Sequence, residues 1–163
     1  MHIRKGTLGD MEQILALYAQ AREFMVRTGN PRQWAARSWP PEWLIRRDIE
    51  QGKCHVCTDG QGIAAVFYFD VGEDIDPTYR CIHEGSWLAD GVYGVVHRIA
   101  ARAGSGAGKY CIRWAYAQCG HLRIDTHGDN RVMQKVLKDL GFSQRGTIYI
   151  AEDNDPRLAY EKI

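Results

Sequence analysis

The sequence predicts a mixed α/β fold in which helices cover both faces of a central sheet of about seven strands. Short hydrophobic runs with the character of strands recur along the chain, and between them lie segments whose hydrophobic residues repeat at helical spacing. In the second half these patterns alternate as strand, helix, strand, helix, strand and strand. Because that order requires crossover connections, we expect a mixed sheet.

The composition is that of an ordinary globular protein. The chain has 163 residues and a formal net charge of +1, and hydrophobic and charged residues make up 45% and 25% of it. A chain of this length can bury one core, so we expect a single domain over residues 1–163. The near-zero net charge gives no broad positive field for a nucleic acid, and no apolar run is long enough to cross a membrane. The first residues lack the apolar core of a signal peptide, which favours the cytoplasm.

The first half predicts a short strand at residues 2–4 and then two helices. Thr7 or Asp10 can cap the first helix, which runs to about residue 27 because its apolar residues repeat at helical spacing. The sequence TGNP at residues 28–31 ends it. A segment rich in tryptophan then leads through two prolines into a second helix at residues 42–51.

Two strands, residues 54–58 and 63–69, flank the sequence DGQG, which is typical of a hairpin turn. The first of them carries Cys54 and Cys57 in a CxxC pattern. Residues three apart on a strand point to opposite faces, so we expect no metal site there. The chain has five cysteines, an odd number that suits reduced thiols better than a disulfide framework.

Residues 71–90 are polar and irregular and predict a long loop, a segment type that often carries function. The remaining elements are expected as strand 93–101, helix 107–118, strand 122–126, helix 130–140, and strands 142–151 and 158–162. The last two strands can close as a hairpin. Their hydrophobic edges are compatible with a homodimer.

A glycine-rich turn separates the strand at 93–101 from the following helix, with the sequence AGSGAGK at residues 103–109. Glycine lets the backbone turn tightly and approach a ligand, and free N–H groups at a helix start favour an anion such as phosphate. Strand-to-helix turns also contain glycine merely to turn, so the pattern alone leaves both interpretations open. No Ser or Thr follows the Gly-Lys pair as a P-loop requires, which argues against a nucleotide hydrolase.

The turn resembles the coenzyme A turn of the GNAT N-acetyltransferase superfamily, and Gly106-Ala107-Gly108 matches its glycine half. Ala103 stands where the family has Gln or Arg, with Arg102 one position away. A second block, from Asn130 to the Gly-Phe pair at 141–142, resembles the family's stretch in the same order, and the likeness covers essentially the whole chain. It implies a three-layer α/β/α fold with a mostly antiparallel sheet.

The resemblance further implies that acetyl-CoA is bound as co-substrate and that its acetyl group passes directly to a primary amine of a small molecule. The implied coenzyme-binding residues lie on the strand, the turn and the next helix start: Ile99, Ala100, Ala101, Gly104, Ser105, Gly106, Ala107, Gly108, Lys109, Asn130 and Met133. Asn130 is also expected as the helix N-cap.

A protonated alkylamine must lose a proton before it attacks a thioester, so a base is needed. Glu84 and His127 are the candidates we favour, ahead of Asp125, and each is also explicable as a solvated or capping residue. The family's tyrosine acid is replaced by Leu137, and Tyr149 or Tyr93 can substitute for it. Tyr149 completes the expected catalytic set.

Trp34 and Trp87 are expected to wall the acceptor site, whereas Trp39 and Trp43 are expected to pack helices on the sheet. Glu73, Asp74 and Asp76 can attract a cationic amine or simply be solvated. Two other functions stay open. The replaced tyrosine and the altered turn favour a non-catalytic acyl-CoA-binding or sensor module, and an open groove would favour a protein or peptide N-acetyltransferase.

Overall fold

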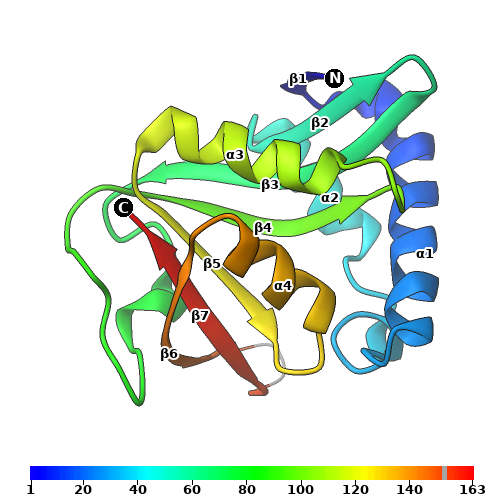
Figure 1. Cartoon of the computed structure of the whole chain (residues 1–163). Helices are drawn as coiled ribbons and strands as arrows, with labels where there is room; N and C mark the ends of the chain where they lie inside the picture. Colours follow the sequence, from blue (N-terminus) through cyan, green and yellow to red (C-terminus); the bar gives the residue numbers. More distant parts are fainter. Residues whose placement is uncertain (152–153) are drawn as a thin grey trace. The chain divides into compact units, whose positions relative to one another are not determined.

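The computed structural model describes residues 1–151 and 154–163. Its strands form a seven-stranded sheet in the order β1-β2-β3-β4-β5-β7-β6 (Figure 1). The strands are β1 (His2–Lys5), β2 (Cys54–Asp59), β3 (Gly62–Gly72), β4 (Tyr93–Ala101), β5 (Leu122–His127), β6 (Ser143–Tyr149) and β7 (Pro156–Lys162). The α-helices of this described part are α1 (Met11–Arg27), α2 (Glu42–Glu50), α3 (Ala107–Cys119) and α4 (Arg131–Asp139). The predicted mixed α/β fold is confirmed.

The chain divides into two compact units. The first comprises Met1–Phe69 and His97–Ile112, and the second comprises Asp70–Val96 and Arg113–Ile163. The expectation of a single domain over residues 1–163 stays a prediction. In the described part of the chain, no helix is both long and apolar enough to cross a membrane.

In the first unit, β1, β2 and β3 pair in antiparallel fashion, and α1 and α2 pack against them. The hairpin between β2 and β3 closes at the pair Asp59 and Gly62, as predicted. The carboxylate of Asp10, the residue before α1, accepts hydrogen bonds from the Thr7 backbone N–H and from the Arg4 guanidinium, each at 2.8 Å, and these bonds hold the turn that precedes the helix. The apolar stripe of α1 packs into a core cluster whose buried members include Ile14, Leu17, Tyr18, Trp34, Ile45, Val56, Val66 and Ala100. The helical spacing of apolar residues in the sequence therefore predicted which face of α1 is buried.

In the second unit, β7 lies between β5 and β6 and pairs with both in antiparallel fashion. The parallel pairing in this unit joins Gly94 to Leu122 and Val95 to Arg123, at the start of β4 and β5. Helix α4 begins after Asn130 and ends at Asp139, and Gly141, two residues later, has a φ of +81°. This C-terminal turn explains why β6 starts at 143 and not at the predicted 142: the Phe142 N–H bonds back to the Leu137 carbonyl.

The long loop after β3 is irregular, as expected, except for a short 3-10 helix at Pro77–Arg80 that the sequence analysis did not predict. Asp76 caps it by accepting from the Thr78 N–H at 2.9 Å, and proline suits its first position. Further along, His83 and Thr147 exchange backbone hydrogen bonds of 2.8 and 2.9 Å, which attach the loop to β6. The attachment fixes the course of the residues that follow.

The crossing of the loop over β6 requires glycine at position 85. A Cβ atom there would lie 1.8 Å from the Arg145 carbonyl oxygen, whereas one at Gly60 would meet nothing within 4 Å. We predict that Gly85→Ala lowers the free energy of unfolding by about 1–3 kcal/mol, the usual cost of overpacking. Gly60→Ala should change it by less than about 0.5 kcal/mol. Urea unfolding measures both, and equal values for the two variants would contradict the assigned crossing.

Candidate functional site

The second half of β4 is bent at Arg98, which has a φ of +51°. This left-handed conformation is rare outside glycine and costs about 1–3 kcal/mol unless neighbours hold it. The Tyr18 hydroxyl donates to the Arg98 carbonyl at 2.7 Å. The guanidinium donates to the Asp48 carboxylate at 2.7 and 3.0 Å and lies 4.6 Å from the centre of the Tyr68 ring. The bend is therefore fixed from three elements of the first unit.

The glycine-rich turn follows directly on this strand. Gly104 and Gly106 have φ values of +74° and +73°, and a Cβ atom on either would meet nothing within 4 Å. Ser105 braces the turn, because its hydroxyl donates to the Arg102 carbonyl at 2.6 Å and accepts from the Ala107 N–H at 3.2 Å. The start of a helix leaves N–H groups that its own carbonyls do not bond, and Ser105 bonds one of them in α3, the Ala107 N–H. Open space beside such donors fits the diphosphate of coenzyme A.

A cavity of about 200 Å³ borders the turn in the first unit. It is lined by Gln20, Ala21, Glu23, Phe24 and Arg27 of α1 and by Ala101, Arg102 and Ala103. Arg102 itself forms an ion pair with Asp59 and its backbone N–H donates to the Ala64 carbonyl. Its side chain is thus engaged by the hairpin between β2 and β3.

The block around Asn130 belongs to the second unit. The Asn130 side chain accepts from the Met133 N–H at 3.1 Å, so the expected N-cap is confirmed. The His127 ring is buried, and its Nδ1 accepts from the Asp129 N–H at 3.0 Å. The Gln134 amide donates to the Gly128 carbonyl at 2.7 Å. These bonds hold the segment between β5 and α4 in one tight turn.

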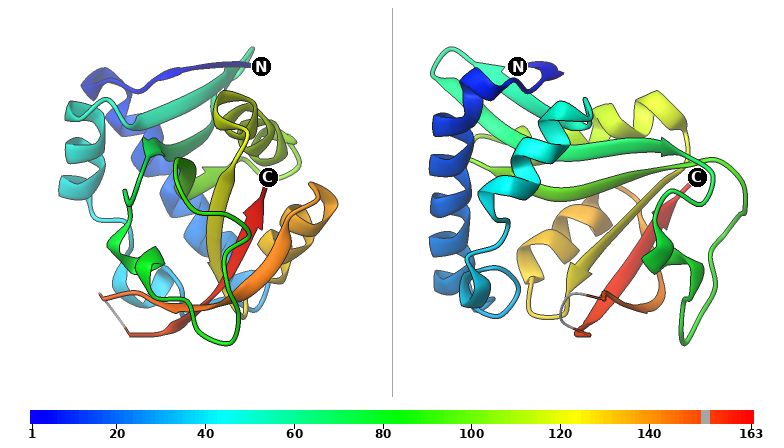
Figure 2. Two further views of the ribbon diagram at one scale, coloured as in Figure 1. Left: turned by 90° about the vertical axis from the view of Figure 1, so that its left-hand side faces the viewer. Right: turned by 180° about the vertical axis from the view of Figure 1, so that it is seen from behind.

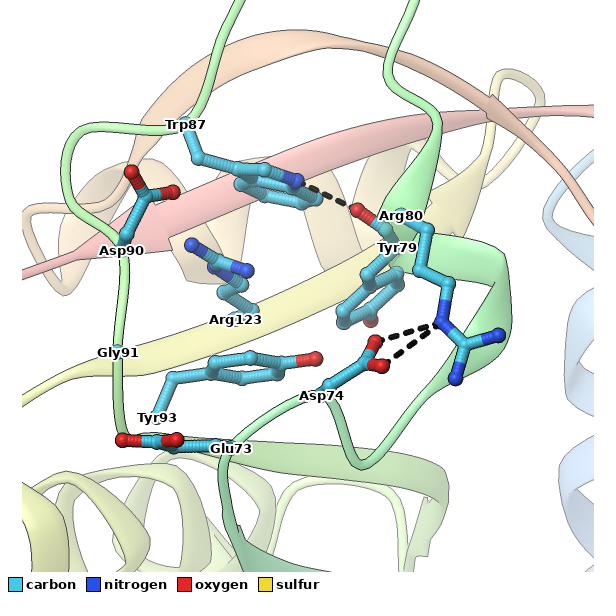
Figure 3. A pocket seen from close by; sticks show the side chains of 9 residues that line it. All are labelled: Glu73, Asp74, Tyr79, Arg80, Trp87, Asp90, Gly91, Tyr93 and Arg123. Atoms are coloured by element: carbon cyan, nitrogen blue, oxygen red, sulfur yellow. Dashed lines mark hydrogen bonds and ion pairs between the residues drawn. The ribbon is translucent and has the colours of Figure 1, made fainter.

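A second cavity, of about 350 Å³ and called the larger cavity in relation to the one beside the turn, lies wholly within the second unit (Figure 3). Its lining residues are Glu73, Asp74, Tyr79, Arg80, Trp87, Asp90, Gly91, Tyr93 and Arg123. The Arg123 guanidinium lies 4.3 Å from the centre of the Trp87 ring and 4.1 Å from that of Tyr93, and Figure 3 shows it between these two rings. On the opposite wall Asp74 pairs with Arg80 at 2.7 Å. The cavity therefore combines aromatic walls with charges of both signs.

Glu161, which is completely buried, holds the lining residue Arg123 in place. Its carboxylate accepts from Arg123 at 2.9 Å, contacts the His121 Nε2 at 2.6 Å and accepts from the Leu88 N–H. The Tyr79 hydroxyl donates to Asp125 at 2.7 Å. Burial raises the pKa of Tyr79 well above its usual value, so this hydroxyl stays a neutral donor.

No protein-family model matches the sequence, and no curated protein matches it either. Among solved structures, the chain is 29% identical to a GNAT-family acetyltransferase from Streptococcus agalactiae, with a TM-score of 0.89 over 99% of this chain and 94% of that one. This likeness confirms the resemblance to the GNAT acetyltransferases. Acetyl transfer is the general activity that this likeness supports.

More distant structures share the GNAT fold alone. A GNAT-family acetyltransferase from Listeria monocytogenes is 18% identical, with a TM-score of 0.68 over 99% of this chain and 93% of that one. A ribosomal-protein-alanine N-acetyltransferase from Brucella melitensis is 15% identical, with a TM-score of 0.61 over 100% and 99% of the two chains.

The residues expected to bind the GNAT coenzyme fall in both units. Those from Ile99 to Lys109 lie in the first unit, on the end of β4, the turn and the start of α3. Asn130 and Met133 lie in the second unit, where they form the N-cap just described. Their contact with a coenzyme stays a prediction.

The three expected catalytic residues all lie in the second unit. Glu84 is exposed in the loop after β3, 3.4 Å from the Thr147 hydroxyl, which donates to it. Tyr149 is exposed at the end of β6, edge-on to the His83 ring at 5.3 Å. His127 and Tyr149 pair with Arg157 and Pro156, consecutive residues of β7, so they share one end of the sheet.

Of the residues expected to bind the acceptor, Trp87 lines the larger cavity, whereas Trp34 is buried in the first unit's core, edge-on to Tyr18 at 5.7 Å. The expectation that Trp43 packs the helices on the sheet is wrong. Its side chain is 61% exposed, and the Arg47 guanidinium lies 5.5 Å from the centre of its ring. Trp39 does pack against the core.

Cys54 and Cys57 point to opposite faces of β2, as the spacing predicted. Cys54 joins the core cluster that contains α1, and Cys57 contacts Cys111 of α3. In residues 1–151 and 154–163, no group of three or more His, Cys, Asp or Glu side chains is placed to hold a metal ion. The expectation that the protein needs no metal stays a prediction.

Three candidate residues were missed at the sequence level. His97 is half-buried on β4 immediately before the bend, with its ring 5.8 Å from that of Tyr68. Arg27 lines the cavity beside the turn. Cys81 is exposed, with its sulfur 3.4 Å from the His83 Nε2. The Cys-x-His spacing is visible in the sequence, but the other two depend on contacts between distant segments.

The bend at Arg98 depends on Asp48. Because the pair is buried, Asp48→Ala leaves the guanidinium without a counter-charge, and we predict a loss of about 3–5 kcal/mol in the free energy of unfolding. The matched control is Asp139→Ala, which removes an exposed pair with Lys135 and should cost less than about 1 kcal/mol. Denaturant unfolding compares the two. A loss no greater for Asp48→Ala than for the control would show that the pair does not hold the strand.

Proposed function

We propose that the protein is an acetyl-CoA-dependent N-acetyltransferase that transfers the acetyl group directly to a primary amine of a small molecule. The observation that carries the proposal is the turn after β4. Two left-handed glycines leave open space beside the first-turn amides of α3, in a chain that resembles the GNAT acetyltransferases. This space suits a bound diphosphate.

In this proposal the backbone of Ile99, Ala100 and Ala101 bonds the pantetheine arm as a neighbouring strand would. The turn from Gly104 to Lys109 binds the diphosphate, and Asn130 and Met133 contribute a further contact. The bend at Arg98 supports this role, because it sets the direction of the three strand residues that follow.

The reaction joins the amine nitrogen to the thioester carbonyl carbon and breaks the carbon–sulfur bond. The amine gives up a proton, and the departing thiolate can take one up. We propose that Glu84, His127 and Tyr149 carry these protons. The His127 Nδ1 accepts a backbone N–H, so the proton of the neutral ring is on Nε2, which suits a donor. Glu84 is an exposed carboxylate that can act through water.

Direct transfer is supported by the state of the buried cysteines. Burial raises the pKa of the Cys54 thiol to about 12 and raises the pKa values of Cys57 and Cys111. A thiol must ionise to act as a nucleophile, so these three are poor acceptors for an acetyl group. Cys81 is exposed beside His83, and its replacement by serine is therefore the informative test of a covalent route.

A small cationic acceptor is supported by the larger cavity, in which we place Trp87 as a wall. The volume of about 350 Å³ falls within the range of small-molecule sites. Glu73 and Asp90 line it without an ion-pair partner among the described residues. Carboxylates together with aromatic faces suit an ammonium group.

The diphosphate assignment is tested at Gly106. Glutamate there brings bulk and negative charge to the turn, so Gly106→Glu should abolish detectable coenzyme A binding in calorimetry. Gly106→Ala imposes the same left-handed strain without the charge and should retain most of the affinity. If Gly106→Glu binds coenzyme A nearly as tightly as the unaltered protein, the diphosphate does not lie at this turn.

The transfer is tested by acetyl-CoA turnover, followed as free-thiol release against polyamines, amino acids, aminoglycosides and short peptides. We predict amine-dependent release that survives Cys81→Ser. In the double variant Glu73→Gln and Asp90→Asn, KM for a cationic amine should rise about tenfold with kcat unchanged. Glu50→Gln, an exposed acid that does not line the cavity, is the control. Coenzyme binding without release under any acceptor would favour the binding-module alternative.

A further inference from the structure

The turn after β4 lacks the side chain that GNAT turns use beside the diphosphate. Position 103 is alanine, and the neighbouring Arg102 is held in an ion pair by Asp59. The backbone amides remain, but a coenzyme diphosphate carries two negative charges, and a positive side chain near it would offset part of that charge.

One face of α1 lies beside this turn, as Figures 1 and 2 show. Gln20, Glu23, Phe24 and Arg27 recur at helical spacing and line the same cavity as Ala101, Arg102 and Ala103. Arg27 is exposed and has no ion-pair partner among the described residues. It therefore offers a charge to the cavity that the protein itself does not neutralise.

The Arg27 guanidinium is not needed to bond the carbonyls at the end of α1. In many helices a basic residue in the last turn bonds the terminal carbonyls. Here the carbonyls of residues 24–26 already accept N–H bonds from residues 28–30. The Arg27 guanidinium is not required for that purpose.

We propose that Arg27 binds the diphosphate of coenzyme A and replaces the Gln or Arg missing at position 103. This inference rests on the proposed function. A guanidinium presents paired donors that match phosphate oxygens, and its long stem lets it reach across a small cavity. Glu23, one helical turn before Arg27, lines the same cavity and opposes the bound anion.

The test measures the affinity of coenzyme A and of 3′-dephospho-CoA by calorimetry with the full chain. Arg27→Gln should weaken both about tenfold, the value of a charge-assisted hydrogen bond, because both ligands carry the diphosphate. Arg27→Lys should recover part of the loss. Glu23→Gln should tighten both ligands. The matched control is Arg46→Gln, which removes an exposed arginine of α2 that does not line the cavity.

Each contrary result has a distinct meaning. Unchanged affinity in Arg27→Gln, with its thermal midpoint near that of the unaltered protein, overturns the inference while the proposed function stands. Weakening of coenzyme A alone places Arg27 at the 3′-phosphate and also overturns it. Failure of the unaltered protein to bind coenzyme A overturns the proposed function together with the inference.

Discussion

The buried pair between Arg98 and Asp48 is the constraint on which the proposed coenzyme site depends. A non-glycine residue at a φ of +51° would relax if its neighbours allowed it. Tyr18 of α1 holds the carbonyl and Asp48 of α2 holds the side chain, so two helices determine the course of one strand. Burial raises the pKa of Asp48 and the Arg98 guanidinium counteracts this, so Arg98 favours the charged form of the Asp48 carboxylate.

Glu161 has the corresponding role in the second unit. The loop between β3 and β4 has little hydrogen-bonded structure of its own beyond one short 3-10 helix. Its path is set by bonds from outside: Leu88 to Glu161, Ala89 to Arg123, and the Tyr79 hydroxyl to Asp125. A fully buried carboxylate is costly unless it is satisfied, and here the partners that satisfy it also fix the wall of the larger cavity.

Much of the fold could be predicted because its signals are local. Apolar spacing located α1, the DGQG turn located the hairpin, and the glycines located the turn after β4. Charged residues on strands were harder to interpret. Glu161 looks like an exposed strand residue in the sequence, and contacts with distant residues such as Arg123, 38 residues away, explain its burial. Trp34 and Trp43 likewise differ in burial, because burial depends on packing between segments that are distant in the sequence.

The arginines of the chain differ in whether a carboxylate of the chain neutralises them. Arg98, Arg102 and Arg123 lie at the places where an anion site would be sought, on β4, on the turn and in the larger cavity. Each is neutralised by a carboxylate of the chain, namely Asp48, Asp59 and Glu161 respectively. Recruiting one of them to a phosphate would leave its carboxylate unpaired, and for the buried pairs that costs several kcal/mol. An exposed arginine such as Arg27 carries no such penalty, so a diphosphate can bind it without breaking an ion pair between described residues.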